Sequence, residues 1–385
     1  MKLLFASDSF KGTLSSDQTA ALLAKAAREV FGEIEYSSVP VADGGEGTTD
    51  AVIAAENGEK IYVDVNGPLM EKTRGWYGKF GENKAVLEMA AASGLPMVPM
   101  EKRNPLNTTS YGTGELIRDA LDKGFTDISI AIGGSATNDG GMGCARALGI
   151  RFLDQDGREL EGRGEDLEKV RVIDVSRLDP RVKEAKITVM CDVTNPLCGE
   201  NGATYTFGAQ KGATPKIQER LEAGMCNYRD IIIRQFGSNP DEVKGAGAAG
   251  GLGTALMVFL GGEMKSGIET VLDLIDFDRR LEGVDLVVTG EGRTDWQSCF
   301  GKVMQGIGLR AKAKGVTAVG LSGSLGRDAN HIFDYGIESL MTTVDGPMPL
   351  EEALDRAEEL YYLGAVRMFR FIKAGMELAK SNTPH

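Results

Sequence analysis

The chain opens with MKLLFASDSFKGTLSSDQTAALLAKAAREVFGEIEYSSVP, residues 1–40. The apolar run 2–6 predicts a buried strand, and residues 34–39 predict a second one. Between them leucine, alanine and valine recur at helical spacing, and Ser15 followed by Gln18 predicts a capping box at the start of a helix. A strand, a helix and a strand in this order are typical of a parallel sheet covered by helices.

The same alternation returns near the other end of the chain. Three predicted strands, a helix and a long helical stretch occupy residues 284–289, 316–321, 337–342, 301–314 and 350–379. We therefore expect an α/β protein of two domains. Residues 1–60 and 284–385 would form a doubly wound, Rossmann-like parallel sheet, and residues 61–283 an inserted mixed α/β domain.

Four loops follow predicted strands of the first domain: SDSFKG (7–12), ADGGEGT (42–48), GEGRTD (290–295) and SGSLG (322–326). Ligands of open parallel sheets bind beyond the carboxyl ends of the strands. We expect these four loops to line one crevice.

Composition narrows the functional class. The 385 residues carry 43 basic and 56 acidic side chains, a net charge of −13, which argues against a nucleic-acid or anionic-membrane partner. The first apolar run is too short for a signal peptide, and no run approaches the ~20 residues that cross a bilayer. We expect a soluble cytoplasmic protein with a small-molecule substrate; the residues leave open whether it forms a homo-oligomer.

Cysteine and histidine usage narrows the chemistry. Five cysteines without a CxxC pair predict neither a disulfide framework nor a zinc site, and they favour a reducing compartment. His331 and His385 are the only histidines. Acid–base work is therefore expected from aspartate, glutamate or lysine.

The loop IGGSATNDGGMG (132–143) follows an apolar strand and opens a predicted helix. Its glycines let the backbone approach a ligand closely, and a strand, a glycine loop and a helix together can cradle phosphate. A tight turn with a good helix cap is the alternative interpretation. We expect nucleotide contacts from Gly133, Gly134, Ser135, Asn138 and Asp139.

A second glycine-rich segment, GAGAAGG (245–251), matches the dinucleotide pattern GxGxxG. The residues before it are polar and turn-like, so the strand that gives this pattern its meaning is missing. A helix start packed closely on a neighbour, or a loop for a substrate anion, is the better interpretation. The chain also lacks GxxxxGK[ST], HRD and DFG, which excludes a P-loop enzyme and a protein kinase.

Carboxylates recur at the predicted strand ends, as Asp8, Asp43, Glu46, Asp192, Glu291 and Asp295. Phosphoryl transfer needs carboxylates to hold Mg²⁺, a group to accept the hydroxyl proton and a cation to neutralise the transferred charge. Lys11, Arg293 and Lys302 lie in the same loops. Each of these side chains alone is more often a helix cap or a surface charge, so the prediction rests on their recurrence.

Together these segments resemble the bacterial glycerate kinase type I family. The matching stretches run in order through the chain: SDSFKG with the following Thr-Leu-Ser (7–15), VADGGEGT (41–48), EMAAASGL (88–95), NTTSYGTGELI (107–117), IGGSATNDGGMG (132–143), DVTNPLCG (192–199), GAGAAGGLG (245–253), TGEGRTD (289–295) and GLSG (320–323). The resemblance implies a two-domain α/β enzyme that phosphorylates D-glycerate with ATP and Mg²⁺, giving 2-phosphoglycerate by direct in-line transfer.

Site residues follow from the resemblance and the motifs together. The expected catalytic residues are Asp192, Asp43 and Lys11, and the expected metal ligands are Glu291 and Asp295. Besides the loop 132–143, the expected nucleotide contacts are Gly44, Gly45, Glu46, Gly247 and Gly250. Two alternatives stay open: an NAD(P)-dependent hydroxy-acid oxidoreductase, resting on GAGAAGG, and a non-catalytic sugar-acid-binding module.

Overall fold

A computed structural model describes residues 1–10 and 12–381. The chain divides into two compact units: unit 1 is residues 1–43 with 268–385, and unit 2 is residues 44–267. The sequence instead predicted the two boundaries after residues 60 and 283. Lys11 lies outside the described residues.

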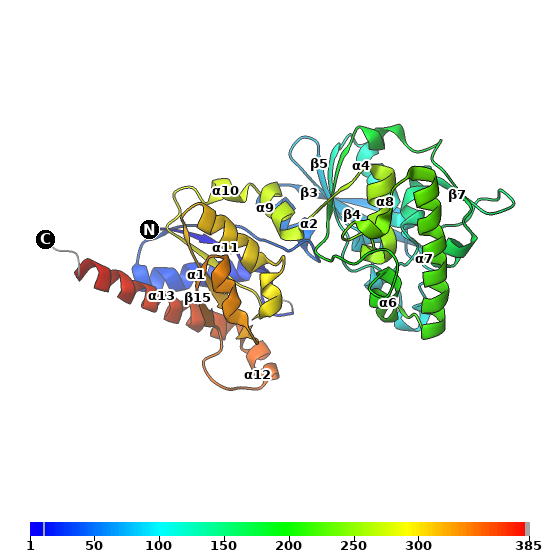
Figure 1. Cartoon of the computed structure of the whole chain (residues 1–385). Coiled ribbons are helices and arrows are strands. Elements are labelled where there is room, and N and C mark those ends of the chain that lie inside the picture. Colours follow the sequence, from blue (N-terminus) through cyan, green and yellow to red (C-terminus); the bar gives the residue numbers. More distant parts are fainter. Residues whose placement is uncertain (11, 382–385) are drawn as a thin grey trace. The chain divides into compact units, whose positions relative to one another are not determined.

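Unit 1 is built on a five-stranded sheet with the order β15-β13-β11-β1-β2 (Figure 1). Every neighbouring pair in it is parallel. The strands are β1 (Lys2–Phe5), β2 (Glu35–Ser38), β11 (Leu286–Thr289), β13 (Thr317–Ser322) and β15 (Ile337–Thr342). The N- and C-terminal segments thus share one sheet, as the two β-α-β patterns predicted.

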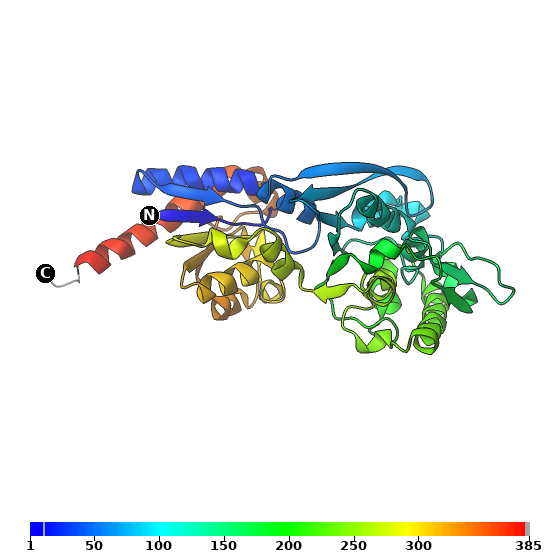
Figure 2. The same ribbon diagram turned by 90° about the horizontal axis from the view of Figure 1, so that it is seen from above.

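Helices cover both faces of this sheet. Alternate side chains such as Leu3, Phe5 and Val288 pack in one cluster with α1 (Ser16–Phe31) and α13 (Ala357–Ser381). The opposite face carries α11 (Val303–Ala313). Figure 2 shows α1 in blue on one side of the sheet and the yellow helices on the other. The remaining helices of this part are α9 (Gly267–Leu274), α10 (Phe277–Arg280) and α12 (Leu350–Asp355). The doubly wound prediction is confirmed.

The first helix shows how local sequence sets an element's bounds. Ser15 accepts a hydrogen bond from the backbone N–H of Gln18, and the Gln18 side chain returns one to the backbone of Ser15, so the predicted capping box is present. Gly32 ends the helix at a φ of 82°, a left-handed conformation in which glycine has no Cβ to clash.

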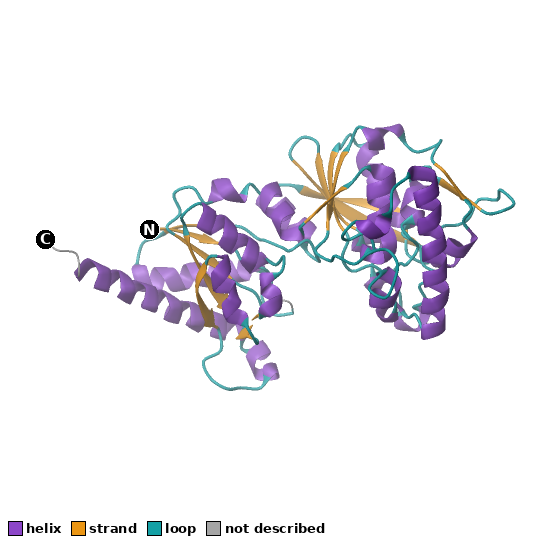
Figure 3. Cartoon of the chain, in the orientation of Figure 1, coloured by secondary structure: helices purple, strands orange, loops and turns teal. Residues whose placement is uncertain are grey.

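Unit 2 holds a mixed six-stranded sheet with the order β10-β9-β6-β5-β4-β3 (Figure 3). The β3–β4 and β4–β5 pairs are antiparallel, and the other pairs are parallel. The strands are β3 (Glu59–Asn66), β4 (Lys72–Phe80), β5 (Lys84–Glu88), β6 (Asp127–Ala131), β9 (Lys186–Met190) and β10 (Glu263–Lys265). A separate two-stranded antiparallel sheet, formed by β7 (Arg151–Leu153) and β8 (Val172–Asp174), lies between β6 and β9 in the sequence.

Most of the core of unit 2 lies on one face of this sheet, where Ile128 and Ile130 of β6 join a large buried cluster. The helices of the unit are α2 (Thr48–Ala55), α3 (Ala90–Ser93), α4 (Tyr111–Asp122), α5 (Met142–Ala147), α6 (Ala203–Phe207), α7 (Pro215–Phe236) and α8 (Ala248–Leu260). The helix α2 packs on β4 and β5. This packing explains why residues 44–60 belong to unit 2, although sequence alone joined them to the first domain. No described helix is both long and apolar enough to cross a membrane.

Candidate functional site

Unit 1 contains a cavity of about 690 Å³ beyond the carboxyl ends of β1, β11 and β13. This volume lies in the range of small-molecule and cofactor sites. All four loops that the sequence placed around one crevice contribute to its lining, through Asp8, Asp43, Glu291 and Ser324 among others. The prediction of a shared crevice within this unit is confirmed.

Backbone hydrogen bonds hold the loops around the cavity in place. The Asp8 N–H donates to the Gly290 carbonyl (3.1 Å), which joins the loop after β1 to the loop after β11. The Gly323 N–H donates to the Glu291 carbonyl (3.1 Å), which joins the loops after β11 and β13. Two short parallel strands, β12 (Arg293–Thr294) and β14 (Ser324–Leu325), continue this link. The polar side chains of the cavity therefore stand on a fixed backbone.

Glu291 is the most buried carboxylate of the cavity, with 8% of its surface exposed. Its Oε1 accepts a hydrogen bond from Thr294 Oγ (3.0 Å), and Thr294 in turn contacts Ser322 Oγ at 2.7 Å. Burial raises the pKa of Glu291, while hydrogen bonding by Ser298 and the nearby charge of Lys302 act in the opposite direction. A cation placed beside this carboxylate would offset the free-energy cost of burying its negative charge.

The other wall of the cavity is apolar. Phe10 and Tyr361 form an edge-to-face pair with ring centroids 5.2 Å apart. Further lining comes from Leu14, Val344, Pro347, Met348, Leu350, Ala353, Leu354 and Ala357. A flat heterocycle suits such a wall, because aromatic and aliphatic side chains stack against it.

Sequence reasoning missed this apolar wall, most of which comes from residues 343–361. Leucine and alanine in that stretch carry the ordinary pattern of a helix core face, and no motif separates a core-facing residue from a ligand-facing one. The exposed Leu350, at 74% of its surface, is the one local signal.

The unit 1 carboxylates predicted for the site fall into two groups. Asp43 and Glu291 line the cavity, and so does Asp8, which the sequence noted at a strand end. Asp295 is not among the lining residues: its Oδ1 accepts the Gln297 N–H at 2.9 Å and caps a short 3₁₀ helix.

Unit 2 brings a second set of predicted residues together at the carboxyl ends of β6 and β9. A Cβ on Gly133 would lie 3.9 Å from the Cα of Gly45, so these two loops adjoin. Gly44 has a φ of 86°, and a Cβ there would lie 2.6 Å from the Cα of Gly267. The Gly267 N–H donates to Asp192 Oδ1 at 3.0 Å. The loops that carry Gly44, Gly45, Gly133 and Asp192 thus form one neighbourhood.

Exposure differs along the predicted nucleotide loops of unit 2. Gly133, Gly134, Glu46 and Asp192 are exposed, while Ser135, Asn138 and Asp139 are buried. Backbone donors at Gly133 and Gly134 are therefore open to a ligand. The buried residues Ser135, Asn138 and Asp139 instead pack inside unit 2 and hold the loop in place.

Asp139 is fully buried, and its carboxylate accepts hydrogen bonds from groups that organise the loop. Ser110 donates through its backbone N–H (2.7 Å) and its hydroxyl (2.8 Å), and the N–H groups of Gly141 and Gly143 donate at 3.1 and 3.2 Å. Burial raises the pKa of Asp139, and these hydrogen bonds oppose the rise. The carboxylate therefore holds the glycine loop to the start of α4.

A buried lysine behind the same loop was not predicted. Lys211 is 2% exposed, and its Nζ donates to the Thr137 carbonyl at 2.6 Å. Burial lowers the pKa of Lys211 to about 7, and the charge of Asp139 acts against this shift. Single lysines are common in any sequence, so no pattern could have found it.

The segment GAGAAGG is used for close packing. A Cβ on Gly247 would lie 2.1 Å from the Pro196 carbonyl oxygen, and a Cβ on Gly250 would lie 2.0 Å from that of Thr137. Both glycines are buried, and Gly250 has a φ of 67°. Between α7 and α8 the described chain has a 3₁₀ turn and no strand. The expected helix start packed on a neighbour is what the structure shows.

Known proteins resemble this chain along nearly its whole length. The model of the glycerate kinase family matches residues 3–373. A glycerate kinase of Bacillus subtilis (strain 168) is 46% identical over 382 residues, covering 99% of both chains. The chain belongs to the glycerate kinase family. It is therefore a kinase, as the motifs indicated.

Two further members of the glycerate kinase family resemble the chain along its whole length. A glycerate 2-kinase of Escherichia coli (strain K12) is 45% identical over 383 residues, covering 99% of this chain and all of that protein (100%). A crystal structure named for glycerate kinase 2 of Salmonella typhimurium LT2 superposes with a TM-score of 0.89 at 42% identity, covering 98% of this chain and 99% of the other.

Proposed function

We propose that the chain phosphorylates D-glycerate with ATP and Mg²⁺, giving 2-phosphoglycerate by direct in-line transfer. Membership of the glycerate kinase family supports the acceptor, and the name of the E. coli relative supports the 2-position. The observation that carries the nucleotide part is the unit 1 cavity, in which an apolar wall faces carboxylates and cations at the end of a parallel sheet.

The cavity has a partner for each part of a nucleotide. The apolar wall around Phe10 and Tyr361 suits the base, and Lys302 and Arg293 suit the phosphates. Oxygen ligands are those that Mg²⁺ prefers, and the cavity offers the carboxylates of Asp8, Asp43 and Glu291. A bound Mg²⁺ would neutralise charge on the phosphates. These residues fit ATP and its Mg²⁺. We assign Asp8 and Glu291 to the metal, with Asp295 as a further candidate ligand. Lys11 stays a proposed catalytic residue.

The acceptor hydroxyl needs a group to take its proton as the new O–P bond forms and the bond to the β-phosphate oxygen breaks. We propose a carboxylate, Asp192 or Asp43, for this role. Asp192 is exposed at the end of β9, next to the open backbone of Gly133 and Gly134. Those glycines, with Gly44 and Gly45, are proposed to contact a bound anion through their backbone N–H groups. Glu46 stays a proposed nucleotide contact.

An enolase-coupled assay tests the function and the position of transfer. Purified protein with ATP, Mg²⁺ and D-glycerate is coupled to enolase with no phosphoglycerate mutase, and phosphoenolpyruvate is followed by absorbance. We expect immediate product formation, because enolase accepts only the 2-phosphate. Product that appears only after mutase is added would show 3-phosphoglycerate. ATP consumption that never responds to glycerate, or a change in nicotinamide absorbance, would contradict the kinase assignment.

A further inference from the structure

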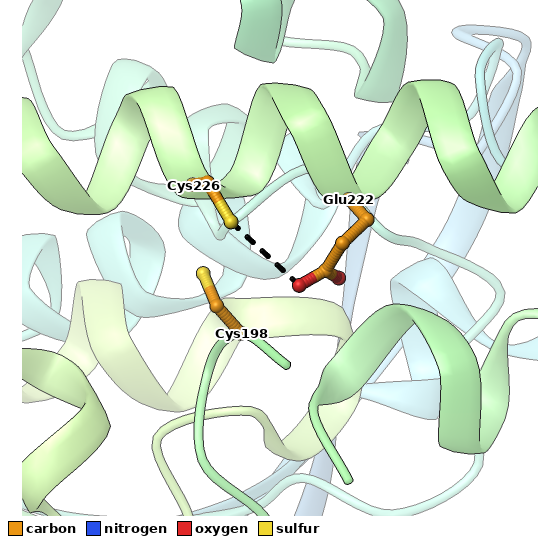
Figure 4. Close-up of side chains that lie close together, drawn as sticks. All are labelled: Cys198, Glu222 and Cys226. Atoms are coloured by element: carbon orange, nitrogen blue, oxygen red, sulfur yellow. Dashed lines mark hydrogen bonds between the residues drawn. The ribbon is translucent and has the colours of Figure 1, made fainter. Parts of the chain in front are cut away.

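Three potential metal ligands meet in unit 2, apart from the loops described above. They are Cys198, Glu222 and Cys226, and their ligand atoms all lie within 4.8 Å of one another (Figure 4). Glu222 and Cys226 stand four residues apart on α7, which places them on one face of the helix. Cys198 reaches them from the loop between β9 and α6. The cluster thus joins a helix to a loop.

The carboxylate in this cluster is only half satisfied. Glu222 Oε1 accepts the Gly199 N–H at 2.6 Å and the Cys226 thiol at 3.7 Å. Glu222 Oε2 is buried, and no described group donates a hydrogen bond to it, although the residue is only 8% exposed. A buried carboxylate oxygen without a donor is costly, so the structure leaves a place for a positive group.

The separations suit a tetrahedral ion. In a four-coordinate zinc site the ligand atoms lie about 2.0–2.3 Å from the metal, so neighbouring ligands stand roughly 3.5–3.8 Å apart. Cys226 Sγ and the Glu222 carboxylate already stand this far apart, at 3.7 Å measured to Oε1, and the undonated Oε2 of the same carboxylate is the oxygen left for the ion. All the ligand separations lie within 4.8 Å, so each exceeds the range of a tetrahedral site by about 1 Å at most.

The surroundings support the ligands. The Cys198 N–H donates to Asp241 Oδ1 at 2.9 Å, and Asp241 Oδ2 is paired with Arg229 at 3.0 Å. Backbone and side-chain contacts of this kind orient metal ligands in proteins. Cys226 is only partly buried, and it offers a path by which an ion can enter.

We propose that Cys198, Glu222 and Cys226 form a binding site for a thiophilic divalent cation, Zn²⁺ in the first instance, with water as the fourth ligand. Two sulfurs and one carboxylate oxygen are a ligand set that favours Zn²⁺ over Mg²⁺. The sequence did not predict a zinc site, because its five cysteines include no CxxC pair. The fold, and not the spacing, brings them together.

Binding releases protons in a defined number. Cys198 and Cys226 are both free cysteines, and a cysteine binds a metal ion as its thiolate. Each sulfur loses its proton to solvent when it bonds to the metal, while Glu222 can bind as the carboxylate. One bound Zn²⁺ therefore displaces about two protons.

The ion would fasten α7 to the loop that carries Asp192. That loop runs from the end of β9 through Asn195 to Cys198. It contacts α7 through the 2.6 Å hydrogen bond that the Gly199 N–H donates to Glu222 Oε1, among other contacts. Bound Zn²⁺ would add a link between the two segments, with one bond to Cys198 of the loop and two bonds to Glu222 and Cys226 of α7. The unit should therefore become more stable. This role does not depend on the kinase assignment.

Metal binding to the fully reduced full-length chain tests the site. We titrate the apo-protein with Zn²⁺ against a chromophoric chelator, and with Co²⁺, whose bonds to thiolate absorb in the near ultraviolet. We expect one equivalent bound, about two protons released in a weakly buffered solution, and a thiolate–Co²⁺ band. Cys198→Ser and Cys226→Ser should each weaken Zn²⁺ binding at least 100-fold and remove most of the band. Glu222→Gln should weaken binding about 10-fold.

Cys191→Ser is the matched control, because Cys191 lies in the same loop but its thiol donates to the Val193 carbonyl instead. Its binding should match the parent chain. Binding that is absent from the parent, or unchanged in Cys198→Ser and Cys226→Ser, would overturn the proposal. So would a Cys198–Cys226 disulfide in the isolated protein combined with no metal uptake after reduction. The Co²⁺ spectrum of the parent chain decides the matter even if a variant fails to fold.

Discussion

Single carboxylates are proposed to hold the metal in the unit 1 cavity. Glu291 is the clearest example, because it is buried, fixed by Thr294 and within the electrostatic reach of Lys302. A side chain held in this way loses little freedom when a metal binds, which favours a ligand role over a surface role.

We predict that Glu291→Gln lowers kcat/KM for ATP at least 100-fold and raises the Mg²⁺ concentration for half-maximal rate. The amide keeps an oxygen that can accept the Thr294 hydrogen bond but loses the negative charge. Steady-state kinetics over a Mg²⁺ series measures both effects. Glu338→Gln, at an exposed position on β15 of the same sheet, is the control and should behave as the parent. Equal Mg²⁺ dependence in all three proteins would remove Glu291 from the metal site.

Lys211 makes a prediction about pH and stability. Its folded pKa is about 7, below the unfolded value near 10.4, so between these limits the unfolded chain binds one proton more than the folded chain. Stability from this group therefore rises with pH across that window, by about 1.4 kcal/mol per unit, and none of that rise is present below pH 7.

We predict that Lys211→Met flattens this dependence. Urea unfolding at pH 7.5, 8.5 and 9.5 should show a smaller slope of unfolding free energy with pH in the variant, by about 1 kcal/mol per unit. The cysteine thiols titrate in both proteins, so their contribution to the slope disappears when the slope of the variant is subtracted from that of the parent chain. Identical slopes would mean that Lys211 is protonated in the folded chain.

At the scale of elements, close packing between loops explains glycines that the sequence assigned to ligand binding. The start of α8 bends through Ala249, Gly250 and Gly251, all with positive φ, before the regular helix begins. This bend lets the segment lie against the loops after β6 and β9, whose Thr137 and Pro196 carbonyls it touches. The two loops carry proposed site residues, so the packing of α8 against them helps to fix the positions of those residues.

We predict that Gly250→Ala destabilises unit 2 by about 2–4 kcal/mol, because the new Cβ would meet the Thr137 carbonyl oxygen at 2.0 Å as well as strain a left-handed backbone. Gly124→Ala is the control: its φ of 85° carries the same strain, but nothing lies within 4 Å of its Cβ. It should cost only about 1 kcal/mol. Denaturation followed by Trp76 fluorescence, in a Trp296→Phe background, measures both. If both variants lose the same free energy of unfolding, the atoms around Gly250 move to admit the new Cβ without a measurable cost.

For the whole molecule, the chain provides one tryptophan in each compact unit: Trp296 in unit 1 and Trp76 in unit 2. Single-tryptophan variants therefore report unfolding of each unit separately. A ligand that binds one folded unit stabilises that unit by mass action.

We predict that ATP with Mg²⁺ stabilises the unit reported by Trp296. At a nucleotide concentration 100 times the Kd, the transition should shift by about 2.7 kcal/mol. ATP without Mg²⁺ should give a smaller shift, because the carboxylates of the cavity then repel the phosphates. A shift confined to the Trp76 transition would place the nucleotide in unit 2 instead.

Local rules in the sequence were enough for the fold class. The capping box at Ser15, the β-α-β alternation and the apolar runs each depend on neighbours a few residues apart, and the parallel sheet of unit 1 appeared as predicted. The strand β4 and the long helix α7 were not predicted: β4 is interrupted by glycines and charges, and α7 carries a mixed polar sequence. The grouping of the strand-end loops of unit 1 followed from the rule for parallel sheets.

Contacts between distant residues were beyond these rules. Asp43 and Glu291 were foreseen at strand ends, but the apolar wall that completes their cavity comes from residues with an ordinary helix pattern. Lys211 and the Cys198–Glu222–Cys226 cluster carry no spacing signal, since their environments are made by segments that meet only in the folded chain. Burial and charge there depend on three-dimensional neighbours, which a pattern along one chain does not contain.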